Sequence, residues 1–139
     1  MAFNVNLGCD ANQFSPVNLA FVGDAVYSLL VRQRLVTEAN RPAAALNKLS
    51  AQRVCAVRQS VDFYRVLPLL DEEEAAILRR GRNASKGYKA KNASSAEYRN
   101  STGLEALFGY LYIKGDNHRI LELFDFCWGE DKNEKQEKL

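Results

Sequence analysis

Residues Asn18–Val31 have the sequence NLAFVGDAVYSLLV, an apolar run that predicts a helix yet holds Gly23 and Asp24 at its centre. Glycine costs about 1 kcal/mol relative to alanine in a helix interior, and aspartate is also a weak helix former. A carboxylate buried without a partner costs considerably more. We therefore expect this Gly-Asp pair to serve close packing or chemistry rather than helix formation, because a glycine lets another backbone or a ligand approach.

Helical periodicity continues on both sides of this stretch and predicts an all-α domain. Ser15 followed by Pro16 is typical of a helix N-terminus, so the first helix is expected from there to about Val36. A second helix is expected to follow Asn40-Arg41-Pro42. Its apolar stripe has helical spacing and comprises Leu46, Leu49, Val54, Val57, Val61 and Tyr64.

Three further segments complete the expected helices. The run DEEE, Asp71–Glu74, matches a capping box with Asp in place of Ser or Thr, so it predicts a helix start. A metal cluster is the alternative for these acids, but the helix macrodipole already favours acidic residues there. The last two helices are expected over 102–113 and 117–128, separated by Gly115-Asp116.

Length and composition indicate one globular domain. The chain has 139 residues, 47% of them apolar, and a formal net charge of +2. We expect an N-terminal segment (1–14), a domain (15–128) and a polar, disordered tail (129–139). No basic-then-apolar leader and no apolar run of 18 residues occurs, so neither a signal peptide nor a membrane helix is expected.

The cysteines favour a reducing compartment. Cys9, Cys55 and Cys127 are odd in number and widely spaced, and no CxxC occurs. This pattern argues against a disulfide framework or a zinc site, so we expect a cytoplasmic protein.

Two acids stand isolated in apolar helices. Asp24 is the sole charged residue between Asp10 and Arg32, and Glu105 is the sole one between Asn100 and Ile113. If the two helix faces meet, both carboxylates share one notch and cannot both stay ionised cheaply without a cation. One or two carboxylates with waters and substrate phosphate are how Mg²⁺ is usually held. The alternatives are an Asp24 satisfied by a backbone N–H or hydroxyl, and a Glu105 paired with an arginine.

The segment over about 79–100 is expected to be a long basic loop. From Arg79 to Arg99 it has seven basic residues and one acid, Glu97, a net charge of +6. Such a cluster is typical of contact with a phosphate backbone, and duplex shape is a better candidate target than stacked single strands. A merely solvated loop is the alternative. The predicted RNA contacts are Arg79, Arg80, Arg82, Asn83, Lys86, Lys89, Lys91 and Arg99.

Four motifs resemble those of a known family. LAFVGDAVY (Leu19–Tyr27) and STGLEALFGYLY (Ser101–Tyr112) resemble the two acidic helices of ribonuclease III. With RGRNAS (Arg80–Ser85) and YRNSTG (Tyr98–Gly103), the chain more specifically resembles Mini-ribonuclease III, the short bacterial branch without a separate double-stranded-RNA-binding domain. The resemblance covers about residues 16–126.

This resemblance implies an all-α, ribonuclease III-like endonuclease domain that forms a homodimeric helical bundle. The implied activity is Mg²⁺-dependent hydrolysis of phosphodiesters in double-stranded RNA, leaving 5′-phosphate and 3′-hydroxyl ends. The implied catalytic, metal-binding acids are Asp24 and Glu105. The implied task is maturation of the 23S (large-subunit) ribosomal RNA precursor, with a ribosomal protein or pre-ribosomal particle as a further partner and no membrane.

The sequence departs from full-length ribonuclease III at two positions. Ala20 and Thr102 stand where that family has a Glu and an Asp, a reduced set that Mini-ribonucleases III share. We therefore expect weaker Mg²⁺ binding. One competing function is a catalytically silent ribonuclease III-like RNA-binding module associated with the ribosome, but retention of both acids argues against it. Another is a helical protein-interaction module, which leaves the basic segment unexplained.

Overall fold

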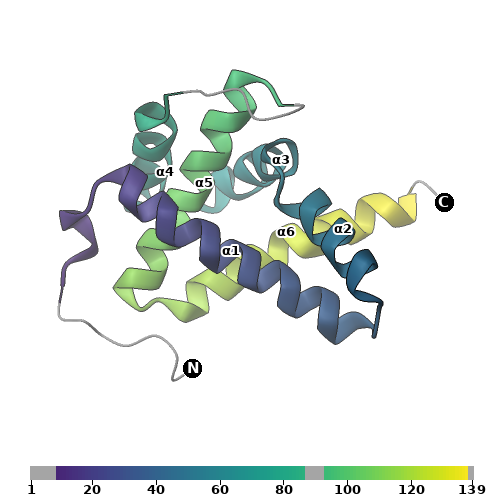
Figure 1. Cartoon of the computed structure of the whole chain (residues 1–139). Helices are drawn as coiled ribbons and strands as arrows, with labels where there is room; N and C mark the ends of the chain where they lie inside the picture. Colours follow the sequence, from purple (N-terminus) through teal and green to yellow (C-terminus); the bar gives the residue numbers. More distant parts are fainter. Residues whose placement is uncertain (1–8, 87–92, 138–139) are drawn as a thin grey trace.

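The computed structural model describes residues 9–86 and 93–137, with side chains to Asn133. These residues form helices and connecting turns without any strand, which confirms the predicted all-α class (Figure 1). The elements are η1 (Ala11–Gln13), α1 (Pro16–Glu38), α2 (Ala43–Val54), α3 (Ala56–Val66), η2 (Leu67–Leu69), α4 (Glu72–Ala84), α5 (Ser95–Lys114) and α6 (Asn117–Glu137).

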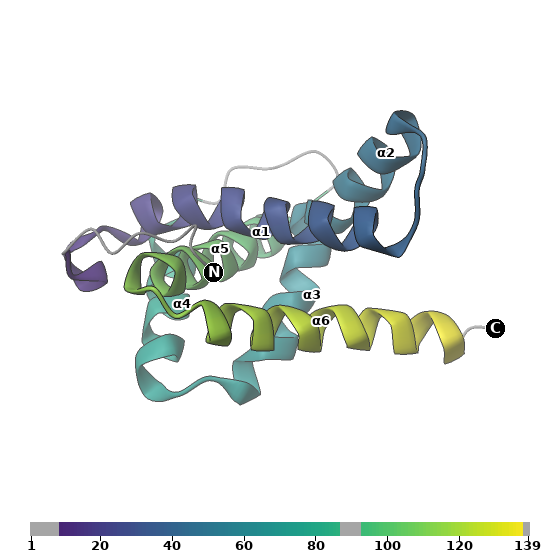
Figure 2. The same cartoon turned by 90° about the horizontal axis from the view of Figure 1, so that it is seen from below.

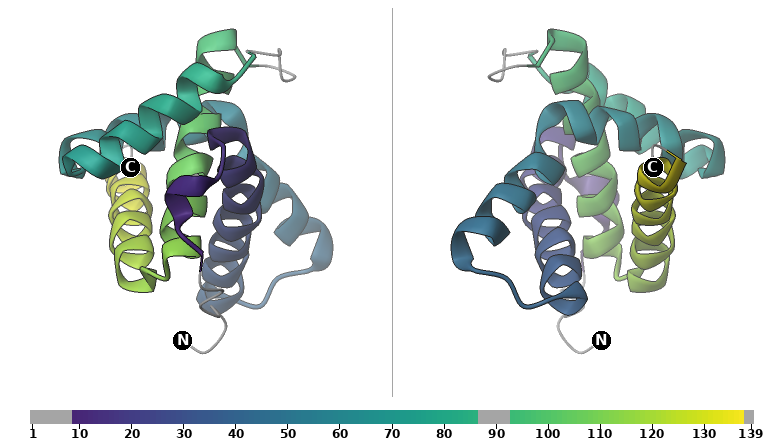
Figure 3. Two further views of the ribbon diagram at one scale, coloured as in Figure 1. Left: turned by 90° about the vertical axis from the view of Figure 1, so that its left-hand side faces the viewer. Right: turned by 90° about the vertical axis from the view of Figure 1, so that its right-hand side faces the viewer.

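Helix α5 lies at the centre of the molecule. Figures 2 and 3 show α1 and α6 on its two sides, with α4 crossing near one end and α2 outside α1. Leu104 to Leu111 are buried except Glu105, and they form the middle of the core. Tyr27 of α1 packs edge-on against Phe108 of α5 and Phe124 of α6, with ring centroids 5.4 and 5.6 Å apart, so aromatic contacts join all three helices.

The helix starts predicted at Ser15 and at Asp71 are confirmed. The Ser15 hydroxyl accepts from the Asn18 N–H (3.2 Å), and Asp71 and Glu74 form the complete capping box. Glu74 is also paired with Arg119 (2.8 Å), and Glu73 accepts a hydrogen bond from Tyr110. The acidic run therefore starts α4 and holds it to α5 and α6.

The predicted second helix is wrong in extent, because two helices occupy it. Cys55 is extended (φ −67°, ψ 157°) and separates α2 from α3, so that α2 packs on α1 while α3 packs on α5. The buried face of α3 also differs from the expected stripe. Tyr64 is 60% exposed, whereas Gln59, Asp62 and Phe63 are buried.

The prediction of a long basic loop is also wrong, because helix α4 continues to Ala84 and α5 already begins at Ser95. Close packing explains the longer α4: a Cβ on Gly81 would lie 2.6 Å from the Ala106 Cβ on α5. At the other side, Ser94 and Glu97 form a second capping box that starts α5.

The tail was predicted to be disordered from 129, and this is wrong as far as Glu137, where α6 ends. Its last described side chains form ion pairs with residues of other helices. Asp131 pairs with Arg58 of α3, and Lys132 pairs with Glu38 of α1 (2.7 Å). These ion pairs attach the polar end of α6 to α3 and α1.

A buried polar network fixes the position of α3. The Asp62 carboxylate is fully buried and accepts hydrogen bonds from Tyr27 of α1, from Arg53 of α2 (2.6 Å) and from Arg65 (3.2 Å). A buried carboxylate is tolerated when cations and donors surround it. The network therefore links α1 and α2 to α3. Helix α3 borders the site described below.

Two simple expectations concern covalent and membrane features. Cys9, Cys55 and Cys127 are all free thiols. Within the described ranges, no helix combines the length and the apolar character needed to cross a membrane.

Candidate active site

Helices α1 and α5 cross with their backbones in contact. A Cβ on Gly23 would lie 1.6 Å from the Glu105 carbonyl oxygen, and one on Gly109 would lie 1.9 Å from the Leu19 carbonyl oxygen. Real side chains cannot occupy such positions, so both glycines are needed for this crossing. The expected role of Gly23 in close backbone packing is confirmed.

The crossing brings the two isolated acids together. Asp24 follows Gly23 on α1 and is exposed, whereas Glu105 on α5 is half-buried. Their carboxyl groups hydrogen bond to each other. Among the described residues, no ion pair with a Lys or Arg reaches either acid, so the alternative of a Glu105–arginine pair is not observed.

The environment disfavours ionisation of Glu105. Burial, the hydrogen bond with Asp24 and the charge of Asp24 together raise the pKa of Glu105 from 4.5 to about 9. Without a cation, Glu105 therefore holds its proton at neutral pH. A hydrogen bond from Gln59 acts in the opposite direction and lowers this pKa.

Gln59 is a site residue that sequence reasoning missed. It is 3% exposed, and its side chain hydrogen bonds to Glu105. Gln59 lies between Val57 and Val61 of the expected apolar stripe and was not among the predicted site residues. Gln59 belongs to none of the sequence motifs, so only the packing of α3 on α5 reveals it.

The residues present fit a hard divalent cation. The two carboxyls supply oxygen donors, and no described Lys or Arg side chain pairs with them, which suits Mg²⁺ completed by waters and substrate oxygens. In the described part of the chain, no group of three or more His, Cys, Asp and Glu residues forms a cage. Thr102 does not replace the missing acid, since its hydroxyl donates to the Tyr98 carbonyl (3.1 Å). Ala20 is buried.

The predicted RNA contacts are distributed over two helices. Arg79, Arg80, Arg82 and Asn83 are exposed near the end of α4, Lys86 is exposed just beyond it, and Arg99 is exposed on α5. Lys89 and Lys91 lie outside the described residues. The Arg82 backbone nitrogen would lie 3.2 Å from a Cβ on Gly103, so the end of α4 packs two residues before Glu105.

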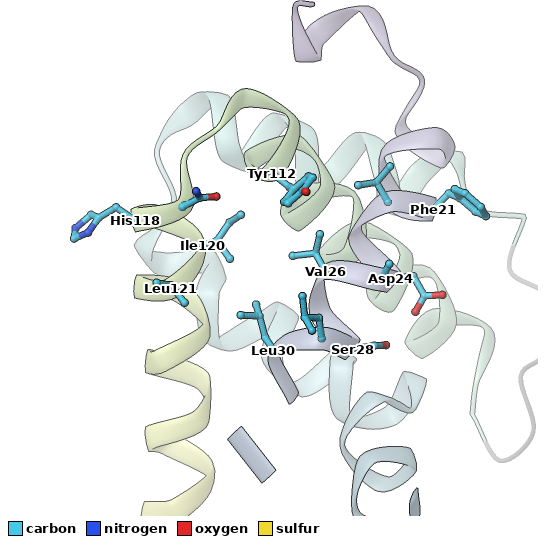
Figure 4. A pocket seen from close by; sticks show the side chains of 13 residues that line it. Phe21, Asp24, Val26, Ser28, Leu30, Tyr112, His118, Ile120 and Leu121 are labelled. Carbon is cyan, nitrogen blue, oxygen red and sulfur yellow. The ribbon is translucent and has the colours of Figure 1, made fainter. Parts of the chain in front are cut away.

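An apolar groove opens between α1 and α6, with a volume of about 800 Å³. Figure 4 shows Ile120 and Leu121 of α6 facing Val26 and Leu30 of α1 across the opening. Phe21, also on α1, projects from its edge and is 84% exposed. Asp24 lies at the same edge, so the groove borders the carboxyl pair.

Comparisons with known proteins point in one direction. The family model described as the Ribonuclease III domain matches residues 17–116, a range that contains both acids. Proteins called Mini-ribonuclease 3 from Thermoanaerobacter sp. (strain X514) and Brevibacillus brevis are each 42% identical to this chain. The first alignment covers 80% of this chain and 78% of the relative. The second covers 82% and 85%.

A more distant relative and a solved structure agree. The Mini-ribonuclease 3 of Enterococcus faecalis is 36% identical over 120 residues, which are 85% of this chain and 91% of the relative. A crystal structure of a Fusobacterium nucleatum protein superposes with a TM-score of 0.79 and 27% identity, covering 88% of this chain and 98% of that one.

Proposed function

Because the chain belongs to the Mini-ribonuclease 3 branch of the ribonuclease III family, and is an endoribonuclease for double-stranded RNA, we propose that Asp24 and Glu105 form its Mg²⁺-dependent catalytic site. The observation that carries this proposal is the contact of two carboxyl groups without a compensating cation from the described side chains. Such an arrangement is costly in a folded protein and is typical of a functional site.

The two acids have different tasks. The backbone of Glu105 packs against α1 at Gly23, and its side chain hydrogen bonds to Gln59. Glu105 therefore provides an oxygen donor in a fixed position. Asp24 is exposed and provides the donor nearest to an approaching RNA strand. When bound, Mg²⁺ supplies charge neutralisation at the scissile phosphate and lowers the pKa of water. We propose 5′-phosphate and 3′-hydroxyl products.

The exposed basic residues bind the duplex backbone in this proposal. Arg79, Arg80, Arg82 and Lys86 provide positive charge at the end of α4, and Arg99 adds charge on α5. Contacts to phosphates set register and affinity but carry little base specificity. These residues therefore place the RNA strand without selecting its sequence.

A second copy of the chain covers the α1–α6 groove. The groove opens on one face of the molecule, and Phe21 projects to solvent at its rim, so two copies related by a two-fold axis can each insert Phe21 into the partner's groove. Asp24 lies at the edge of this face, so the proposed dimer presents two carboxyl pairs to the two strands of one duplex.

The proposed substrate is the precursor of 23S ribosomal RNA, processed in the cytoplasm during ribosome biogenesis, with a ribosomal protein or pre-ribosomal particle as a partner. The support is the relationship to Mini-ribonuclease 3 proteins, together with free thiols in the described chain.

The decisive experiment is cleavage of duplex RNA by the purified protein with Mg²⁺ or with EDTA. We expect Asp24→Asn and Glu105→Gln to abolish cleavage while each still shifts duplex RNA in a gel. Arg32→Gln, on the exposed surface of α1, serves as a charge control and is expected to cleave normally. Normal cleavage by both acid variants would reject the site, and binding without any cleavage by the parent protein would favour the silent RNA-binding module.

A further inference from the structure

The side chain of Gln59 is buried between α3 and α5, yet it is polar. It is 3% exposed and hydrogen bonds to the Glu105 carboxyl. Burying an amide is costly unless its groups have partners, so this contact compensates the burial. Because so little of its surface is exposed, Gln59 cannot make extensive contact with RNA.

A neighbouring set of hydrogen bonds fixes the register of α3 on α5. The Asn100 amide donates to the Ser60 hydroxyl (3.0 Å) and to the Tyr64 hydroxyl (3.4 Å), one turn apart on α3. Ser60 directly follows Gln59 in α3, and the buried Asn100 lies five residues before Glu105 in α5. Gln59 and Glu105 are therefore brought together by an independently tied pair of helices.

On these contacts we propose that Gln59 is a positioning residue, whose amide N–H orients the Glu105 carboxylate toward the cation that the site binds. This inference rests on the proposed function, since it assigns a supporting role within that site. Glu105 therefore has two side-chain partners, the buried Gln59 and the exposed Asp24.

The physical reason is the small number of acids. In a site with two carboxyl groups, one misoriented oxygen is a larger share of the oxygens that the protein supplies than in a site with four. Removal of a residue that hydrogen bonds to a metal ligand lowers metal affinity or activity by about 10–100-fold. Because Asp24 is exposed, Glu105 is the donor whose orientation the protein can fix through buried contacts.

The test replaces Gln59 by leucine, which has nearly the same shape and lacks the amide. We expect Gln59→Leu to fold and to bind Mn²⁺ about 10–100-fold more weakly than the parent by isothermal titration calorimetry. At subsaturating Mg²⁺ its kcat is expected to fall, and raising Mg²⁺ is expected to restore most of it. Its KM for duplex RNA at saturating Mg²⁺ is expected to remain unchanged.

Two controls separate the outcomes. Gln33→Leu makes the same change at an exposed position of α1, nine residues beyond Asp24, and is expected to bind Mn²⁺ like the parent. If Gln59→Leu binds Mn²⁺ normally while Asp24→Asn and Glu105→Gln abolish cleavage, the inference fails and the proposed site stands. If the acid variants cleave normally, the site itself fails. A lower melting temperature with unchanged Mn²⁺ affinity would identify Gln59 as merely structural.

Discussion

The α-carbon of Gly23 faces the backbone carbonyl of Glu105 so closely that a Cβ would lie 1.6 Å from its oxygen. This contact joins the two helices at the positions where each has its isolated acid. It places Asp24, the next residue, beside the Glu105 carboxyl. The clearance at a glycine and the pairing of two acids are therefore one structural feature.

Substitution of Gly23 should destabilise the whole domain. Gly23→Ala forces α1 and α5 apart, because the obstructing atoms belong to the backbone rather than to a flexible side chain. We expect a loss of at least about 3 kcal/mol in the free energy of unfolding, measured by urea denaturation. Gly129→Ala is the matched control, since a Cβ there meets nothing within 4 Å. It should increase stability by about 0.5–1 kcal/mol, and an equal loss in both variants would contradict the close contact.

The stability of the metal-free protein should fall with increasing pH. In the folded state the pKa of Glu105 is raised to about 9, whereas in the unfolded chain it is near 4.5. Between these values the folded state holds a proton that the unfolded state has released, so the contribution of Glu105 to stability is fully present below pH 4.5 and is lost as pH rises to 9. Thermal melting in EDTA across this range measures the effect.

Glu105→Gln should remove most of this pH dependence and raise the melting temperature at neutral pH in EDTA. Glu72→Gln, an exposed change in the first turn of α4, should leave the slope unchanged. A parent-like slope in Glu105→Gln would show that another group causes it.

Charge removal at the end of α4 should reduce the salt dependence of RNA binding. Each phosphate contact contributes about one unit to the slope of log affinity against log salt. We expect Arg80→Gln with Arg82→Gln to lower this slope by about two and to weaken binding to all duplex sequences alike. The control neutralises two exposed lysines elsewhere, Lys48 on α2 and Lys114 on α5. A similar reduction in both double variants would indicate a general effect of net charge.

Phe21 should control the oligomeric state. Phe21→Lys places a charge where the proposed partner has an apolar groove. In analytical ultracentrifugation we expect this variant to sediment as a monomer and the parent protein to sediment as a dimer. The control is Val36→Lys, which alters an exposed apolar residue of α1 that does not line this groove. A dimeric Phe21→Lys variant would place the interface on another surface.

The sequence alone determined the helical class, the starts of α1 and α4, and the two acids. Helix caps and apolar periodicity are local signals, so Ser15 and the Asp71–Glu74 capping box were predictable. The acids were recognisable because Asp24 and Glu105 interrupt long uncharged runs, and Gly23 indicated a close approach of something unidentified.

Tertiary structure decided the rest, because the forces involved act between helices. The close approach to Gly23 is made by the Glu105 backbone, 82 positions further along the chain. Packing of Gly81 against Ala106 keeps α4 helical through residues that local composition assigned to a loop. Packing of α3 against α5 buries Gln59, which was not among the predicted site residues, and makes it a partner of Glu105. A sequence records which groups can ionise or pack, whereas only the assembled helices set their distance and exposure to water.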